Sequence, residues 1–365
     1  MDNVMSLFVS LLALIGILLV MQIITVEIMA RKALKTNNTG YFMIFNLPYS
    51  YNRSARMGFV YFFVYLLFFS EKVFSTEWFL YLLVFIAMGI VSDAVVQYLV
   101  LYYGKIRFKK YIVETEKLED EVKAYFNQEE VASEDYERSM PTYNEIELTK
   151  KYLQPTDHLA FMSIDGGDYV KSFQTYQEVT FDVEPFFDQY QVEQNLFGLP
   201  IKVTGLTQEK GLPFKDNHID LFANEYSTYD KNEVVRVLKP GGIFVLNQNG
   251  SENLKEFLNM YMPLALRSQW NVETAKQSLI NVGFTILEAY EDYGYLHFRS
   301  LSQLDTYLKK VVPELTKERE KFVTFYTQAL RDIKNQGFYS LSTYRFIIIA
   351  KLTGSYQEIA QEHQS

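Results

Sequence analysis

One stretch near the amino terminus constrains the fold of this chain more than any other. Met5 to Thr25 is a run of 21 residues without a charged side chain. A helix of about 20 apolar residues is long enough to cross the ~30 Å hydrocarbon core of a bilayer. The run therefore predicts a transmembrane helix. A cleaved signal peptide is the alternative, but the leader is acidic where such peptides are basic, and no Ala-x-Ala site follows.

Two further apolar runs extend this expectation. Trp78 to Tyr103 is the second, and Met57 to Ser70, extended to residues 55–74, is the third. Basic segments at 30–56 and 105–110 favour the cytoplasmic side. We therefore expect a three-helix transmembrane anchor (about 5–29, 55–74 and 78–103) in a bacterial cytoplasmic membrane, with the N-terminus outside and the C-terminal domain cytoplasmic. Asp93 lies within the last span, where an acid is either functional or placed at the interface or against a neighbouring helix.

Charge divides the chain into unlike parts. Residues 1–110 hold ten basic and five acidic residues, whereas the remainder holds 25 basic and 39 acidic ones. Within the remainder, residues 114–147 contain twelve acids and three bases, which is typical of a solvated linker. The domains are predicted as an anchor (1–110), an acidic neck (111–144), a folded domain (145–354) and a tail (355–365).

Several kinds of site are excluded by the residues that the chain lacks. It has no cysteine, which rules out disulfides, thiolate zinc sites and cysteine-ligated iron–sulfur clusters. Its four histidines are scattered without metal-ligand spacing, so we expect no metal. The acidic C-terminal part carries no basic stripe, so no nucleic-acid partner is expected either.

From Asp157 onward, short apolar runs alternate with helical stretches, which predicts an α/β fold. Seven strands are expected, in a mostly parallel sheet whose last strand is the candidate for antiparallel pairing: 158–164, 178–181, 201–204, 219–223, 243–247, 285–290 and 346–351. Helices are expected at 251–260, 272–282, 302–312 and 317–335.

A distinctive motif begins at Glu233 and reads EVVRVLKPGG before an apolar strand. Pro240 ends a helix, and Gly241 with Gly242 permits a tight turn. Together with the upstream GLPFKDNHIDL from Gly211, this segment resembles the class I S-adenosylmethionine-dependent methyltransferases, in particular a bacterial branch. The resemblance covers residues 145–352 and implies a Rossmann-like methyltransferase fold with S-adenosylmethionine as the cofactor.

The resemblance also implies where a cofactor would bind. The first turn of the family, an acid followed by G-x-G-x-G, corresponds to residues 161–169 here, where Gly166 and Gly167 are kept and Asp165 takes the place of a glycine. Asp182 matches the acid that binds the ribose hydroxyls, although an exposed acid at a strand end is the competing interpretation. The candidate cofactor-binding residues are Asp165, Gly166, Gly167 and Asp182, and no catalytic residue is assigned.

Two functions follow from these observations. The loss of the strand-end acid, of glycines in the turn and of the acid that holds the adenine argues for a degraded cofactor site. The preferred hypothesis is a binding or scaffold module at the inner membrane face, with the lipid bilayer and a membrane or cytosolic protein as partners. The alternative is an active S-adenosylmethionine-dependent methyltransferase acting on a membrane-proximal protein or lipid-like substrate, with the four candidate residues lining the cofactor.

Overall fold

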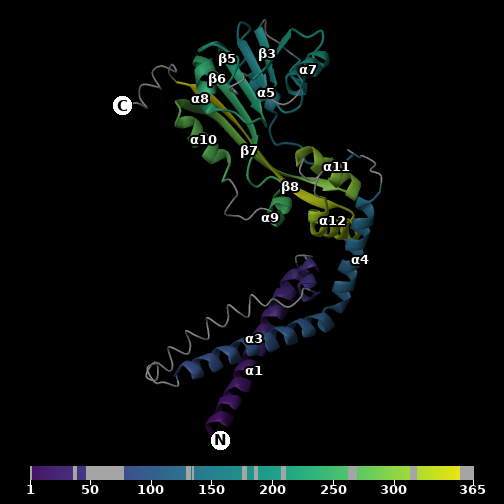
Figure 1. Ribbon diagram of the computed structural model, residues 1–365. Helices are drawn as coiled ribbons and strands as arrows, with labels where there is room; N and C mark the ends of the chain where they lie inside the picture. Colours follow the sequence, from purple (N-terminus) through teal and green to yellow (C-terminus); the bar gives the residue numbers. More distant parts are fainter. Residues whose placement is uncertain are drawn as a thin grey trace. The chain divides into compact units, whose positions relative to one another are not determined.

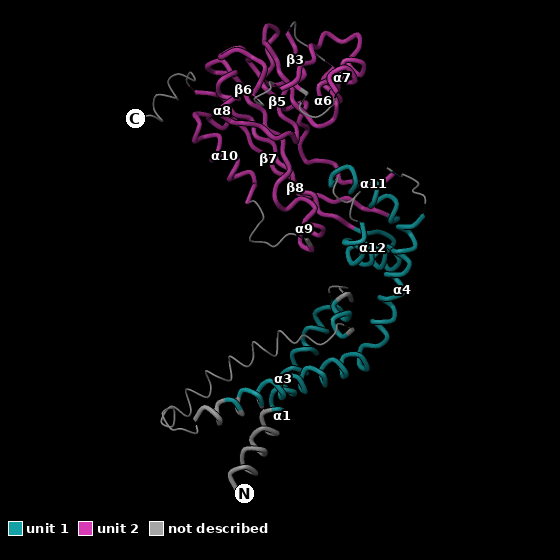
Figure 2. Tube along the Cα trace, in the orientation of Figure 1, with its two compact units in different colours: residues 1–134, 299–339 teal, residues 135–298, 340–365 magenta. Residues whose placement is uncertain are grey.

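The chain forms two compact units in a computed structural model, which describes residues 2–35, 39–46, 78–128, 133, 135–174, 179–184, 188–206, 211–261, 269–312 and 319–353. The first unit comprises residues 1–134 and 299–339, and the second comprises residues 135–298 and 340–365 (Figures 1 and 2). The C-terminal helices at 299–339 thus group with the N-terminal helices and not with the sheet.

The first unit is helical. Glu27 joins its N-terminal helices, because it accepts a hydrogen bond from the Tyr103 hydroxyl (2.6 Å) and lies 3.3 Å from the Arg107 guanidinium. Asp93 is buried and accepts a hydrogen bond from Gln97, one turn further along the same helix (2.7 Å). The elements are α1 (Asp2–Lys35), η1 (Thr39–Asn46), α3 (Trp78–Arg107), α4 (Lys109–Phe126), α11 (Leu301–Val311), η5 (Arg319–Phe322) and α12 (Val323–Gln336).

A buried carboxylate organises the C-terminal helices of this unit. Asp305 on α11 is fully buried and accepts hydrogen bonds from the Tyr326 hydroxyl and the Arg319 guanidinium, both at 2.6 Å. On α12, Arg331 is also buried and donates to the hydroxyl of Thr115 on α4 (2.8 Å). Buried charges are retained in a fold when they are paired in this way, so these contacts hold α4, α11 and α12 together.

The predicted membrane anchor is wrong. Within the ranges that the structure describes, no helix combines the length and the apolarity needed to cross a membrane. The helix that contains the uncharged run continues through Glu27, Arg31, Lys32 and Lys35, and α3 buries the polar Ser92, Asp93 and Gln97 along its length. The predicted multi-pass membrane localisation and the predicted orientation depended on this anchor and are wrong as well. The expected middle helix at 55–74 lies outside the described residues.

The second unit is built on one sheet in the order β1-β7-β8-β6-β5-β2-β3-β4 (Figure 1). From β6 to β4 the neighbouring strands run parallel, β8 is antiparallel to β6, and β1 is antiparallel to β7. The strands are β1 (Glu137–Arg138), β2 (His158–Met162), β3 (Val179–Glu184), β4 (Ile201–Gly205), β5 (Ile219–Glu225), β6 (Leu238–Asn249), β7 (Phe284–Phe298) and β8 (Tyr339–Leu352).

The expected seven-stranded, mostly parallel sheet is therefore corrected to a mixed sheet of eight strands. Each of the seven predicted segments overlaps an observed strand, and the antiparallel pairing of the last one is confirmed. The additional strand, β1, has two residues, both exposed, in the acidic segment predicted as linker. A strand this short has no readable alternation, so only its pairing with β7 identifies it.

Side chains of the central strands are buried on both faces. Along β2, Leu159 and Phe161 pack in one core cluster, whereas Ala160 and Met162 pack in the other. This is the pattern of a parallel sheet covered by helices on each side. The helices of this unit are α5 (Glu145–Lys150), α6 (Asp168–Ser172), α7 (Gln189–Asn195), α8 (Lys231–Val237), α9 (Lys255–Tyr261) and α10 (Val272–Ile280).

Candidate functional site at the carboxyl ends of β2, β5 and β6

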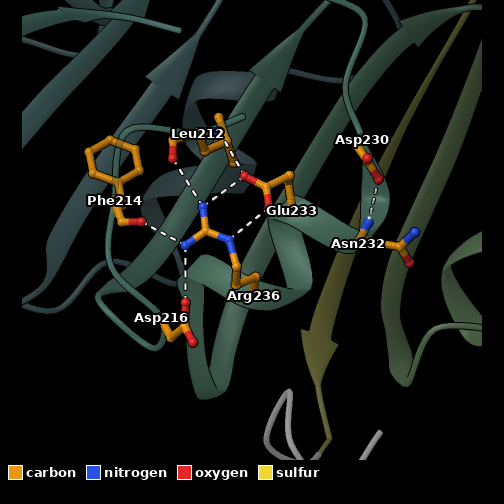
Figure 3. Close-up of polar contacts among 7 residues, drawn as sticks. All are labelled: Leu212, Phe214, Asp216, Asp230, Asn232, Glu233 and Arg236. Carbon is orange, nitrogen blue, oxygen red and sulfur yellow. Dashed lines mark hydrogen bonds and ion pairs between the residues drawn. The ribbon is translucent and has the colours of Figure 1, made fainter. Parts of the chain in front are cut away.

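The two motifs that carry the family resemblance form one hydrogen-bonded corner at the amino ends of β5 and β6 (Figure 3). The Arg236 guanidinium donates to the backbone carbonyls of Leu212 (3.0 Å) and Phe214 (2.7 Å) and to the Asp216 carboxylate (3.1 Å). Glu233 pairs with Arg236 (2.7 Å) and accepts from the Leu212 backbone N–H (2.8 Å). Its hydrogen bonds to Arg236 hold the pKa of the Glu233 carboxyl below its usual value. We call this set the Arg236 corner.

The Pro-Gly-Gly segment completes this corner and serves the backbone. Gly241 has φ of +82°, which side-chain-bearing residues rarely adopt. A Cβ on Gly242 would lie 2.8 Å from the carbonyl oxygen of Lys239 and 3.2 Å from that of Asp220. The Lys239 ammonium pairs with the Asp220 carboxylate at 2.6 Å. The three charged side chains of the motif, Glu233, Arg236 and Lys239, are thus all engaged in contacts that hold the fold.

The predicted cofactor turn follows β2 and is folded back onto α7. Gly166 and Gly167 have φ of +69° and +94°, and the Ser163 hydroxyl donates to the Asp165 carboxylate (2.5 Å). Asn195, at the end of α7, donates through Nδ2 to the carbonyl of Gly166 (2.9 Å). Asp165, Gly166 and Gly167 thus lie in the turn after β2, where a side chain of the protein already binds the backbone.

Asp182 is placed differently from the exposed strand end that was the competing interpretation. It lies within β3, opposite Phe161 of β2 and Val203 of β4, and is only 1% exposed. Two residues of β3 follow it, so it does not stand at the end of the strand. A ribose would need the carboxylate to be open to solvent, and this arrangement does not offer that.

A group of acids that are distant in sequence meets at the carboxyl edge of the sheet. Glu145 lies in the first turn of α5, Glu225 ends β5, and Asp165 stands in the turn after β2. The Asn247 amide, near the end of β6, donates to the Glu145 carboxylate. We call Glu145, Asp165 and Glu225 the carboxyl cluster.

The acids of the carboxyl cluster influence one another. Burial, then the charges on Glu145 and Asp165, raise the pKa of Glu225 to about 9. Burial also raises the pKa of Glu145, and a hydrogen bond from Glu225 opposes this effect. At neutral pH Glu225 is therefore protonated and donates a hydrogen bond to Glu145.

Three tyrosines lie within electrostatic range of the carboxyl cluster. Burial raises the pKa of the Tyr143, Tyr169 and Tyr226 hydroxyls, and the charge of Glu145 adds to this rise in each case. Tyr226 has φ of +54°, an uncommon conformation for an aromatic residue. Such strained residues persist where the surroundings hold them and are frequent at functional sites.

Two buried side-chain amide atoms at this edge have no hydrogen-bond partner in the described part of the chain. They are Asn224 Nδ2 and Asn247 Oδ1. Both residues are fully buried. Buried polar groups almost always have partners, so a set of exceptions in one place calls for an explanation.

No cluster of histidine, aspartate or glutamate suited to holding a metal ion occurs among the residues that the structure describes. The site residues expected from the sequence included Asp165 but not Glu145, Glu225 or Asn247. Glu145 is the first residue of the predicted folded domain, directly after the acidic neck, and its N-cap Asn144 was the available signal for a helix there.

Comparison with known proteins yields structural similarity only. No family model matches the chain, and no curated protein matches it. Similar solved structures include a proposed methyltransferase of Bacillus halodurans, with 13% identity, TM-score 0.44, and coverage of 58% of this chain and 99% of that one. The YcgJ protein of Bacillus subtilis shows 18% identity, TM-score 0.41 and the same coverage.

An S-adenosylmethionine-dependent methyltransferase of Mesorhizobium loti shows 12% identity and TM-score 0.34 over 56% of this chain and 96% of that one. Similarity at these values bears on neither activity nor ligand. The Rossmann-like fold is identified by the strand order itself, which follows the order 3-2-1-4-5 of doubly wound sheets from β4 to β6.

Proposed function

We propose that this protein is a methyltransferase-like binding module in which the cofactor site has been replaced by the carboxyl cluster. The observation that carries the proposal is the contact of Glu145 with Asn247 across the carboxyl ends of the strands, with Glu225 beside them. In this fold a ligand lies at that edge. Here the edge is built from acids and tyrosines instead of open glycine backbone.

The predicted cofactor residues support this proposal through their surroundings. A nucleoside cofactor needs backbone amides that it can approach and a carboxylate that its ribose can reach. The carbonyl of Gly166 is bound by Asn195, a Cβ on Gly167 would lie 3.1 Å from the Leu196 side chain, and Asp182 is buried within β3. The residues present do not fit S-adenosylmethionine in the manner that the family resemblance implies.

Calorimetric titration of the full-length protein with S-adenosylmethionine tests the proposal. We expect no binding heat with the cofactor at millimolar concentration. Binding in the low micromolar range that disappears in Asp182→Ala would instead support the alternative, an active methyltransferase. Gln191→Ala, an exposed change on α7, serves as the matched control for handling of a variant.

A further inference from the structure

The carboxyl cluster lies between β2 and β5, from which successive strands are added to the sheet in opposite directions. β2 and β5 are adjacent and parallel; β3 and β4 extend the sheet on one side, and β6 extends it on the other. Asp165 follows β2, and Glu225 is the last residue of β5. In open α/β sheets the crevice at the carboxyl ends of two such strands is where ligands bind.

An unpartnered polar atom provides a second and independent observation. Asn247 is fully buried and lies opposite Glu225 in the parallel β5–β6 pair. It uses its Nδ2 on Glu145 and leaves its Oδ1 without a partner in the described structure. Asn247 therefore presents free hydrogen-bonding capacity next to the acids, which is what a bound polar molecule would satisfy.

The charge around the carboxyl cluster is unbalanced. Arg345 on β8 contributes positive charge to the surroundings of Glu145, but its guanidinium is paired with buried Asp292 at 3.0 Å. The three carboxyl groups thus have little positive charge to balance them. The proton on Glu225 reduces their negative charge instead. A ligand that brought its own positive charge could displace that proton.

We infer that the carboxyl cluster binds the primary ammonium group of a small organic cation. This inference rests on the proposed function and names the class of its ligand. An ammonium carries three N–H donors, which match the carboxylates of Glu145 and Glu225 and the acceptor Oδ1 of Asn247. A quaternary ammonium has no donor and leaves those acceptors unsatisfied. The tyrosine rings add the aromatic surface that favours cations.

Binding of this kind is coupled to a proton. Below about pH 9, an entering ammonium has to displace the proton of Glu225, so affinity is expected to rise about tenfold per pH unit between pH 7 and 9. An alkylammonium keeps its own charge over that range because its pKa resembles that of lysine, about 10.4. The charged and titratable groups around Glu225 are Glu145, Asp165, Tyr169, Tyr226 and Arg345 with its partner Asp292.

The test is calorimetric titration of the full-length protein with methylammonium chloride, in buffers of different ionisation enthalpy. Potassium chloride controls for ionic strength, and tetramethylammonium chloride controls for charge without donors. We expect methylammonium alone to bind, with release of about one proton at pH 7.5. Glu225→Gln is expected to abolish proton release and weaken binding about tenfold or more, whereas the exposed surface change Glu252→Gln is expected to leave both unchanged.

Absence of methylammonium binding above the potassium control would overturn the inference, as would equal binding of tetramethylammonium or full binding by Glu225→Gln. A parallel titration with S-adenosylmethionine separates this failure from that of the proposed function. Micromolar binding of the cofactor overturns the binding-module proposal. If neither S-adenosylmethionine nor methylammonium binds, only the ammonium site is overturned.

Discussion

The two ends of the β5–β6 strand pair are built on opposite principles. At the amino ends, the charged side chains of the Arg236 corner and the carbonyls of Leu212 and Phe214 all have partners. At the carboxyl ends, the carboxyl cluster brings like charges together and leaves buried polar atoms of Asn224 and Asn247 without partners in the described structure. One end is arranged for stability, and the other is arranged at a cost to stability.

This contrast separates family resemblance from function. The motifs that resemble methyltransferases lie in the Arg236 corner, where they hold a loop, a helix and a turn in place. Such a corner is needed by the fold whatever the protein binds. The chemistry of the chain has to be read at the opposite end, where sites are placed in folds of this kind.

The largest effect is expected from Arg236→Ala. It removes the donor shared by the carbonyls of Leu212 and Phe214 and leaves Glu233 with an unpaired, partly buried charge. We expect the free energy of unfolding to fall by about 3 kcal/mol, measured by urea unfolding. Arg236→Lys keeps the charge but loses the planar guanidinium group. Its free energy of unfolding should therefore lie between those of the wild type and of Arg236→Ala. A loss below about 1 kcal/mol for the alanine variant would contradict the structural role.

The glycine pair at the same corner gives the next largest effect. Gly242→Ala places a Cβ 2.8 Å from a backbone carbonyl, and we expect it to cost about 2 kcal/mol. Gly241→Ala meets only the end of the flexible Lys351 side chain, so its cost is that of a positive φ alone, about 1 kcal/mol. The difference between the thermal unfolding midpoints of the two variants measures the effect of steric crowding at Gly242. A larger loss of stability for Gly241→Ala than for Gly242→Ala would contradict this explanation.

At the other end, pH should separate Glu225 from ordinary acids. Its pKa is about 9 when folded and 4.5 in the usual reference. In this window the folded protein keeps a proton that the unfolded chain releases, so stability falls as pH rises from about 4.5 to about 9. Glu225→Gln is expected to remove much of this dependence of stability on pH. Near pH 8 its free energy of unfolding should exceed that of the wild type by about 1–2 kcal/mol.

The measurement is urea unfolding of both proteins at several pH values, with Glu252→Gln as the control that keeps the slope. If the free energy of unfolding changes with pH by the same slope in the wild type and in Glu225→Gln, Glu225 does not titrate in this window. The description of the carboxyl cluster would then be wrong.

The smallest effect is expected from Asn195→Ala, which frees the carbonyl of Gly166 and the carboxylate of Asp168. Two partly exposed hydrogen bonds of this kind contribute about 1 kcal/mol together. Gln191→Ala on the same helix is the matched control and should change little. Hydrogen exchange in the turn after β2 is the sensitive readout, and unchanged protection there would show that Asn195 does not hold the turn.

Much of the second unit could be predicted from local sequence. Apolar runs bounded by turn residues located seven strands, and Pro240 with its two glycines located the corner, because each signal lies within about a dozen residues. In the first unit the same method located helices, such as α3 and α11, but assigned a membrane environment to the N-terminal ones, which is wrong. An uncharged run of sufficient length looks the same whether it faces lipid or packs in a helical unit, and hydropathy by itself does not distinguish the two.

The sequence by itself determined the α/β alternation, the antiparallel last strand and the helix, turn and strand around Pro240, since these depend on the order and spacing of neighbouring residues. Only the tertiary structure decided that Asp182 is enclosed within β3, that Asn195 binds the glycine turn, and that Glu145 meets Asn247 across 102 positions of chain. The physical reason is that parallel strands bring their carboxyl ends together from distant parts of the chain, so the side chains that form a site share no local pattern.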